Sequence, residues 1–260
     1  MGFLISKDVL NTIRNPMLLK SRIFSTIFVS IFTSGVYYRF TGEYTERLNW
    51  TALSGFYFFM AIFMLMSALS PVELVFPLER GVFLKEEGSK LYSTFNYFLS
   101  RNIVELPASF IFPLLATLIM YWFVGLSSTP GQFFITYLIA YLLTVNGLSL
   151  GLLLGAMIED QKAVAEVTPI LLLPLVLFSG FFKNSASLPR WIGWVEYISP
   201  IKYGFSSWMQ NEVSEASTSN IAELNFDTSM WLGIGLLIIM SMALRVASLF
   251  FLWIMRKRLE

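Results

Sequence analysis

Residues 106–158 read LPASFIFPLLATLIMYWFVGLSSTPGQFFITYLIAYLLTVNGLSLGLLLGAMI, a run of 53 residues that contains no Asp, Glu, Lys or Arg. A membrane-spanning helix needs about 20 mostly apolar residues, so this run is too long for one crossing and suits two. A turn-rich segment at residues 125–131 divides it. We therefore predict two consecutive spans, near residues 92–124 and 132–158.

Further apolar runs satisfy the same length criterion and bring the predicted number of spans to six. They lie near residues 21–38, 49–75, 163–182 and 229–255. The sequence therefore predicts an all-α polytopic membrane protein, with residues 1–260 forming a single transmembrane domain in the lipid bilayer.

Two segments outside the spans also carry apolar residues at helical spacing. Within residues 1–20 these residues alternate with polar ones, which predicts an amphipathic helix on the membrane surface. An extension of the first span fits the same pattern. Residues 183–228 form the longest predicted loop, and aromatic residues on either side of Pro200 predict two short helices that dip into the outer interface.

The distribution of positive charge predicts the orientation of the chain. An even number of spans puts both termini on the same side of the membrane. With cytosolic termini, the inner segments carry eleven Lys and Arg residues and the outer segments five. Because positive residues concentrate in cytoplasmic loops, we predict a multi-pass protein with cytosolic N- and C-termini.

Composition excludes several functional classes. Only 13% of residues are charged, about half the fraction of soluble domains, and the net charge of +1 gives no electrostatic basis for binding nucleic acid. The chain has no Cys and no His, which excludes thiol catalysis, Ser-His-Asp chemistry and metal ligation by imidazole or thiolate. We predict neither a catalytic residue nor a metal site in this chain, and an enzyme is the least favoured class.

A charged and aromatic segment follows the predicted second span. It contains Glu79-Arg80, Phe83 and Glu86, and it is followed by Tyr97-Phe98-Leu99 and then by Glu105-Leu106-Pro107. This combination resembles the transmembrane domain of the G subfamily of ATP-binding cassette transporters, which includes White-like and breast-cancer-resistance-like members.

Other segments extend the resemblance along most of the chain. Ile13-Arg14-Asn15-Pro16 resembles the connecting helix of that family, and Phe178-Ser179-Gly180-Phe181-Phe182 resembles the outer end of its fifth span. The stretch from Tyr197 to Phe205 is similar to its external re-entrant segment. Arg245 fits its last span.

One departure from the family is large. Its members carry a nucleotide-binding domain ahead of the connecting helix, whereas this sequence starts at that helix and has no Gly-x-x-x-x-Gly-Lys-Ser/Thr phosphate loop. The resemblance implies that ATP and magnesium bind in a partner ATPase domain outside this chain. A transport domain alone, a fragment and one subunit of a larger system all fit the sequence.

The resemblance also implies roles for particular residues. Two membrane halves would pair as a homo- or heterodimer around a cavity between the second and fifth spans, and opposed Phe pairs would close its exit. The implied substrate-cavity residues are Phe59, Phe63, Met66, Leu173 and Val176, the exit valve is Phe181 and Phe182, and the ATPase-coupling residues are Glu79, Arg80, Phe83 and Glu86. The alternatives are plain helix packing for the cavity residues, an interfacial aromatic belt for the Phe pair and a solvated loop for the coupling residues.

A polar contact is expected at Glu73, which lies at the inner end of the second span. An unpaired charge is costly there, so Arg14 or Arg22 is its hypothetical partner.

The function implied by the resemblance is ATP-driven export of lipids, sterols or lipophilic compounds by alternating access. An ion-coupled secondary transporter is an alternative, but such proteins place ionisable groups near the bilayer midplane, and the 53-residue uncharged run opposes this. A non-transporting scaffold or modulatory relative remains a third interpretation.

Overall fold

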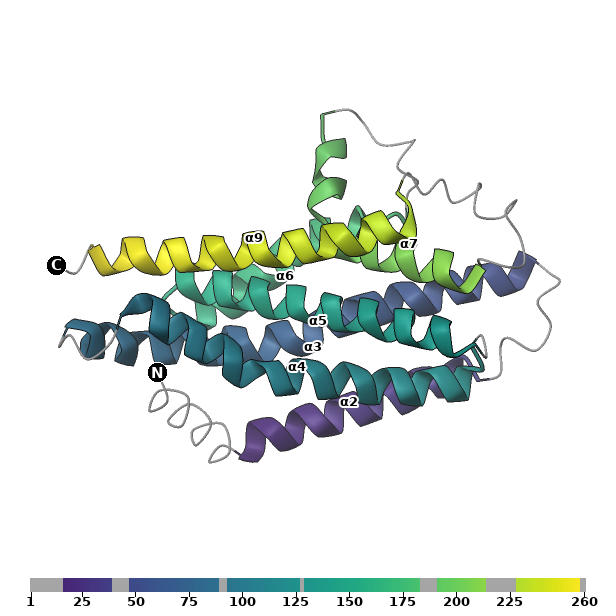
Figure 1. The fold of residues 1–260 in the computed structure, drawn as a ribbon, viewed down its shortest axis with the longest axis horizontal. Coiled ribbons are helices and arrows are strands. Elements are labelled where there is room, and N and C mark those ends of the chain that lie inside the picture. The colour runs from purple at the N-terminus through teal and green to yellow at the C-terminus, as the bar shows by residue number, and fades with distance from the viewer. Residues whose placement is uncertain are drawn as a thin grey trace.

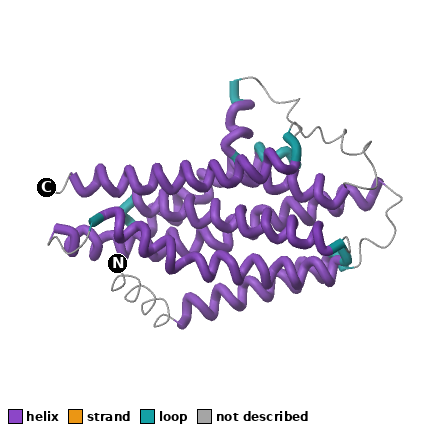
Figure 2. The backbone as a smooth tube through the Cα atoms, viewed as in Figure 1, coloured by secondary structure: helices purple, strands orange, loops and turns teal. Residues whose placement is uncertain are grey.

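The computed structural model describes residues 16–38, 47–88, 93–126, 129–182, 191–213 and 228–257. Within these ranges every regular element is a helix, which confirms the all-α fold class (Figures 1 and 2). The elements are α2 (Pro16–Val36), α3 (Arg47–Gly88), α4 (Thr94–Val124), α5 (Pro130–Met157), α6 (Gln161–Leu177), the 3-10 helix η3 (Gly193–Ile198), α7 (Pro200–Val213) and α9 (Met230–Lys257).

The long helices lie side by side in an elongated bundle, and α2 begins toward the same end at which α9 finishes (Figure 1). In the described ranges, four helices are long and apolar enough to cross a membrane. They are Thr51–Pro77, Thr94–Val124, Pro130–Met157 and Met230–Met255. The helices α2 and α6 do not meet this criterion, so four of the six predicted spans are supported.

Helix α5 is the central element of the bundle. In its most apolar window 83% of the residues are buried within the chain, against 33% for α4 and 22% for α9. Its glycines allow α3 to come very close, since a Cβ on Gly147 would lie 2.0 Å from the carbonyl oxygen of Leu65. Small residues permit such close backbone packing in membrane helices.

Helix α2 has its polar and apolar faces reversed relative to a soluble protein. Thr26, Ser30 and Thr33 are buried, while Phe24 and Phe32 are among its most exposed residues. Helix α2 packs mainly against α4. Buried hydroxyls and exposed rings are the arrangement expected when hydrocarbon, rather than water, surrounds a helix.

Two element boundaries differ from the predictions. Helix α3 continues to Gly88 without a break, although the charged segment around Glu79 was interpreted as an inner loop after the second span. Pro71 and Pro77 lie within the helix. A 42-residue helix is about 63 Å long, which is twice the hydrocarbon thickness, so α3 extends well beyond one crossing. Helix α6 ends at Leu177, five residues before the predicted end of the fifth span.

Candidate functional site

Four phenylalanines from three parts of the chain form an aromatic cluster, which consists of Phe58, Phe181, Phe182 and Phe205. The ring of Phe58 stacks on Phe181 with centroids 4.3 Å apart and meets Phe182 edge-on at 5.2 Å. Phe205 of α7 contacts Phe181 at 6.1 Å. The two residues of the predicted exit valve therefore belong to one packed cluster, in which Phe181 is half-buried and Phe182 is 59% exposed.

The turn after α6 positions this pair. Gly180 has φ of 89°, a left-handed conformation that favours glycine, and it lies directly before Phe181. Phe181 and Phe182 therefore lie in a non-helical turn after α6. The predicted span of 163–182 had implied that they form the last turn of the helix.

Ser199 joins the end of α6 to the beginning of α7. Its hydroxyl donates to the carbonyl oxygen of Leu175 at 2.7 Å. That carbonyl lacks its usual helical donor, because the Ser179 amide reaches Val176 instead. The same Ser199 oxygen accepts the Lys202 amide at 3.4 Å, as the residue before a helix commonly does.

A buried ion pair reinforces the same junction. The Nζ atom of Lys202 lies 3.3 Å from Oε2 of Glu196, and each side chain is only 7% exposed. The ammonium also lies 5.0 Å from the ring centroid of Tyr197, within the range of a cation–π contact. These contacts join η3 to the first turn of α7.

Helix α7 lies inside the bundle. The sequence had predicted it only as an external segment that dips into the interface. Trp208 is fully buried, donates from Nε1 to the carbonyl of Thr136 at 3.0 Å and stacks on Tyr57 at 5.7 Å. Tyr57 in turn donates to Glu212 at 3.1 Å. The sequence signal that could have predicted this burial is the presence of small residues, such as Gly204, between the aromatic ones. A Cβ on Gly204 would lie 2.5 Å from the side chain of Leu143.

The five predicted substrate-cavity residues fall into two groups. Phe59 of α3 is 42% exposed and Leu173 of α6 is 60% exposed. Phe63, Met66 and Val176 are half-buried and pack against the main apolar core. Helices α3 and α6 contact each other, so the exposed pair belongs to neighbouring helices, whereas the other three also serve packing within the chain.

Glu73 contacts α6 and not α2. The hydroxyl of Thr168 donates to its carboxylate, and both side chains are buried. The hypothesis that Arg22 pairs with Glu73 is therefore wrong, because α2 packs on α4 and brings Arg22 to Glu105 instead. The other hypothetical partner, Arg14, lies outside the described residues.

An ion cluster consists of Arg22, Arg101 and Glu105. Nη1 of Arg22 and Nη2 of Arg101 each lie 3.3 Å from a different carboxylate oxygen of Glu105. The guanidinium of Arg22 also lies over the ring of Phe112, 4.7 Å from its centroid. One carboxylate thus holds two guanidinium groups at the interface of α2 and α4, a contact that no sequence pattern had indicated.

The predicted ATPase-coupling residues lie on the extension of α3. Phe83 is buried, and its ring stacks on Tyr97 of α4 with centroids 4.3 Å apart. This ring therefore packs inside the chain and fixes the extension against α4. The backbones of Glu79, Arg80 and Glu86 are helical, and their side chains lie outside the described part of the structure.

Metal ligation finds no support in the described ranges. No group of three or more acidic, His or Cys side chains gathers there to hold an ion. The candidate site therefore remains the exposed apolar side chains of α3 and α6 near the aromatic cluster, and their role in a substrate cavity stays a prediction.

Comparison with known proteins agrees with this architecture. Residues 1–213 match the family described as ABC-2 type transporter (ABC2_membrane). Protein white of Drosophila melanogaster is 28% identical over 220 residues, which are 85% of this chain and 32% of that protein. Protein white of Ceratitis capitata is 28% identical over 212 residues, or 82% of this chain and 31% of that protein.

A mammalian relative shows a similar match. The broad substrate specificity ATP-binding cassette transporter ABCG2 of Rattus norvegicus is 27% identical over 206 residues, which cover 78% of this chain and 30% of that protein. The chain thus spans about a third of the length of these curated relatives. The resemblance found in the sequence is confirmed, and the chain belongs to the ABC-2 type transporter family, as a membrane domain related to the White-like G subfamily of ATP-binding cassette transporters.

Proposed function

We propose that this membrane domain moves lipids, sterols or other lipophilic compounds out across a membrane, by alternating access driven by ATP hydrolysis in a nucleotide-binding domain. The observation that carries the proposal is the exposed apolar surface of α3 and α6 beside the aromatic cluster, where Phe59 is 42% exposed and Leu173 is 60% exposed. An apolar wall binds a lipophilic compound through buried area, at roughly 25 cal/mol per Å².

The membrane placement in this proposal has six crossings and cytosolic termini. Helices α2 and α6 supply the two crossings beyond the four long apolar helices. The reversed faces of α2 support its contact with lipid, since its rings are exposed and its hydroxyls are buried. Helix α7, buried among α3, α5 and α9, would act as the re-entrant segment that closes the domain from outside.

A second transmembrane half would complete the cavity. Ile170, Leu173 and Leu177 recur along one side of α6 and are all exposed. Their spacing of three and four residues produces a continuous apolar stripe, which suits either the facing half of a homo- or heterodimer or a substrate held between the halves.

The exit would be closed by Phe181 and Phe182 from both halves. Phe181 is anchored by its stack on Phe58, whereas Phe182 projects from the cluster. An anchored ring beside a projecting one suits a valve, because the projecting rings from two halves can meet and exclude water until the halves separate.

Force from ATP hydrolysis would enter through the extension of α3. Glu79, Arg80 and Glu86 lie on a helix that continues without a break into the second span, and Phe83 packs that extension against α4. Motion of a docked ATPase domain would then tilt α3 as one lever. This chain's own residues include no phosphate loop, so ATP and magnesium would bind in the partner domain.

Reconstitution tests the proposal. The protein is purified with the ATPase that accompanies it and placed in liposomes loaded with a fluorescent lipophilic compound. We expect vanadate-sensitive, ATP-dependent transport that falls when Leu173→Arg places a charge on the exposed stripe, and that survives Ile239→Arg on the exposed face of α9. Transport driven instead by a proton or sodium gradient would support the secondary transporter. A protein that binds an ATPase without moving any compound would support the modulatory relative.

A further inference from the structure

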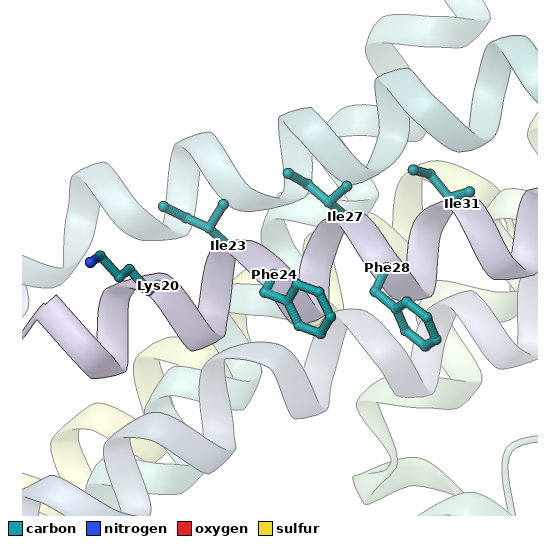
Figure 3. Close-up of a pocket in the computed structure, with 6 residues that line it drawn as sticks. All are labelled: Lys20, Ile23, Phe24, Ile27, Phe28 and Ile31. Carbon is teal, nitrogen blue, oxygen red and sulfur yellow. The ribbon is translucent and has the colours of Figure 1, made fainter.

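Helix α2 carries a shallow groove on the face turned away from the bundle. Its volume is about 430 Å³, and its walls come from two rows of side chains spaced four residues apart. Figure 3 shows Ile23, Ile27 and Ile31 along one side, Phe24 and Phe28 along the other, and Lys20 at one end. Rows at this spacing are the ridges into which another elongated group can pack.

The opposite face of α2 is already occupied. Arg22 is held there in the ion cluster, and Thr26 and Thr33 are buried near it. Among the described residues, the groove is therefore a side of α2 that is lined by no other helix. Phe24 stacks on Phe28 with centroids 5.7 Å apart, so the aromatic wall is ordered without a partner.

The charge at the end of the groove narrows the choice of occupant. Lys20 is exposed and has no carboxylate partner among the described residues. A cation at one end of an otherwise apolar groove matches a molecule with one anionic end and a long apolar tail. A second protein helix in this groove would need an acidic residue opposite Lys20 and an apolar face as long as the groove.

The length of the groove matches one half of a bilayer. Eleven residue steps separate Lys20 from Ile31, which amounts to about 16 Å along a helix. One leaflet contributes about 15 Å to the hydrocarbon core. A lipid whose phosphate lies at Lys20 therefore has an acyl chain of the right depth to end near Ile31.

We infer that this groove binds a glycerophospholipid of the inner leaflet, with its phosphate at Lys20 and one acyl chain between the isoleucine and phenylalanine rows. The inference rests on the membrane placement of α2 in the proposed function. It adds a lipid site on the outer wall of the domain, separate from the exposed stripe of α6 that would face substrate.

Photolabelling of the complete protein tests this site. The protein is placed in nanodiscs of phosphatidylcholine and phosphatidylserine that contain phosphatidylserine with a diazirine in its acyl chain. After illumination, mass spectrometry measures the label on residues 23–31 and on α9. The variants are Ile27→Trp, which fills the groove, and Lys20→Glu, which reverses its charge. The matched control is Ile239→Trp, which adds the same indole to an exposed position of α9.

We expect Ile27→Trp to lower the label on α2 severalfold while the label on α9 stays constant. Lys20→Glu should lower it by at least about fivefold, because the loss of one lysine charge near an anionic surface alone corresponds to that factor. Ile239→Trp should leave the label on α2 unchanged.

Three results would overturn the site. Equal labelling of α2 in all variants would mean ordinary contact with bulk lipid. Covalent capture of residues 1–15, or of a second copy, in the groove would identify a different occupant. An unlabelled α2 beside a labelled α9 would instead contradict the membrane placement of α2. The efflux assay separates these results from the proposed function, because Ile27→Trp leaves the α6 stripe intact and should still transport.

Discussion

The aromatic cluster and the ion cluster lie toward opposite ends of the bundle and are held together by different forces. Phe58 occurs early in α3 and Glu105 early in α4, and these helices run in opposite directions (Figure 1). The aromatic cluster depends on ring contacts of 4.3 to 6.3 Å, which are individually weak and tolerate sliding. The ion cluster depends on a carboxylate that two guanidinium groups share, and its loss leaves charge buried.

This difference indicates which end can move. Ring stacks can separate and re-form at small cost, so the aromatic cluster suits a valve. A buried ion cluster resists separation, because each intermediate position exposes an unpaired charge to hydrocarbon. We therefore expect α2 and α4 to move as one unit.

The largest effect is expected for Glu105→Gln. Removal of this charge leaves Arg22 buried without its only carboxylate partner in the described residues. Loss of one partner from a buried ion pair typically costs about 3–5 kcal/mol. Thermal unfolding in detergent should show a much lower midpoint. Glu166→Gln, on the exposed side of α6, is the control and should change stability by less than about 0.5 kcal/mol. Equal midpoints for both variants would contradict a stabilising ion cluster.

A smaller effect is expected where α3 meets α6. Thr168→Val removes the hydroxyl that donates to Glu73 and leaves this carboxyl group buried without a hydrogen bond. Such a loss costs about 1–3 kcal/mol. Thr144→Val is a matched control, because among the described residues the hydroxyl of Thr144 bonds only to the Ala140 carbonyl of its own helix. If the two valine variants unfold at the same temperature, the contact between Glu73 and Thr168 does not join the helices.

The junction of α6 and α7 should respond more weakly. Ser199→Ala removes both the contact to Leu175 and the cap of α7, at a cost of about 1 kcal/mol. Ser206→Ala is the control, since in the part of the chain that the structure describes the hydroxyl of Ser206 bonds only to the carbonyl of Tyr203 within α7. We expect compound to cross the membrane without ATP hydrolysis in Ser199→Ala, because the turn that bears Phe181 is no longer fixed. Normal transport coupling in that variant would show that the junction does not position the valve.

The smallest effects on stability are expected for the two valve residues, and Phe181 and Phe182 should differ from each other. Phe181→Ala loses stacked rings and should destabilise the fold by about 1 kcal/mol. Phe182→Ala removes a mostly exposed ring and should change stability by less than about 0.5 kcal/mol. Leakage of a small dye from proteoliposomes should nevertheless increase in both. Retention of the dye in the Phe182 variant would assign this ring to the interfacial belt instead.

Sequence reasoning was most accurate where the signal was a long uncharged run. The predicted spans at 92–124 and 132–158 differ from α4 and α5 by no more than two residues at each end. It was less accurate at charged segments. The stretch around Glu79 was predicted to be a loop because it carries charge, yet its residues continue α3, since polarity ends a membrane crossing without ending a helix.

Only part of the candidate site could be predicted from the sequence. The position of Phe181 and Phe182 was recognised from a resemblance, but their packing against Phe58 joins residues more than a hundred positions apart. The burial of α7 was missed for a related reason. Its mixed composition of Ser, Lys and aromatic residues is typical of an interface helix, and only the neighbouring helix α5 supplies the hydrogen-bond partner of Trp208.

The sequence by itself determined that this chain belongs in a membrane and is helical there, because a run of 53 uncharged residues costs free energy in water and must satisfy its backbone internally in lipid. Only the tertiary structure decided which charge pairs with which. Arg22 lies with Glu105, and Glu73 lies with Thr168, because α2 packs on α4 while α3 packs on α6. Helical periodicity shows which residues share a face, but the neighbour of that face is set by the packing of the whole bundle.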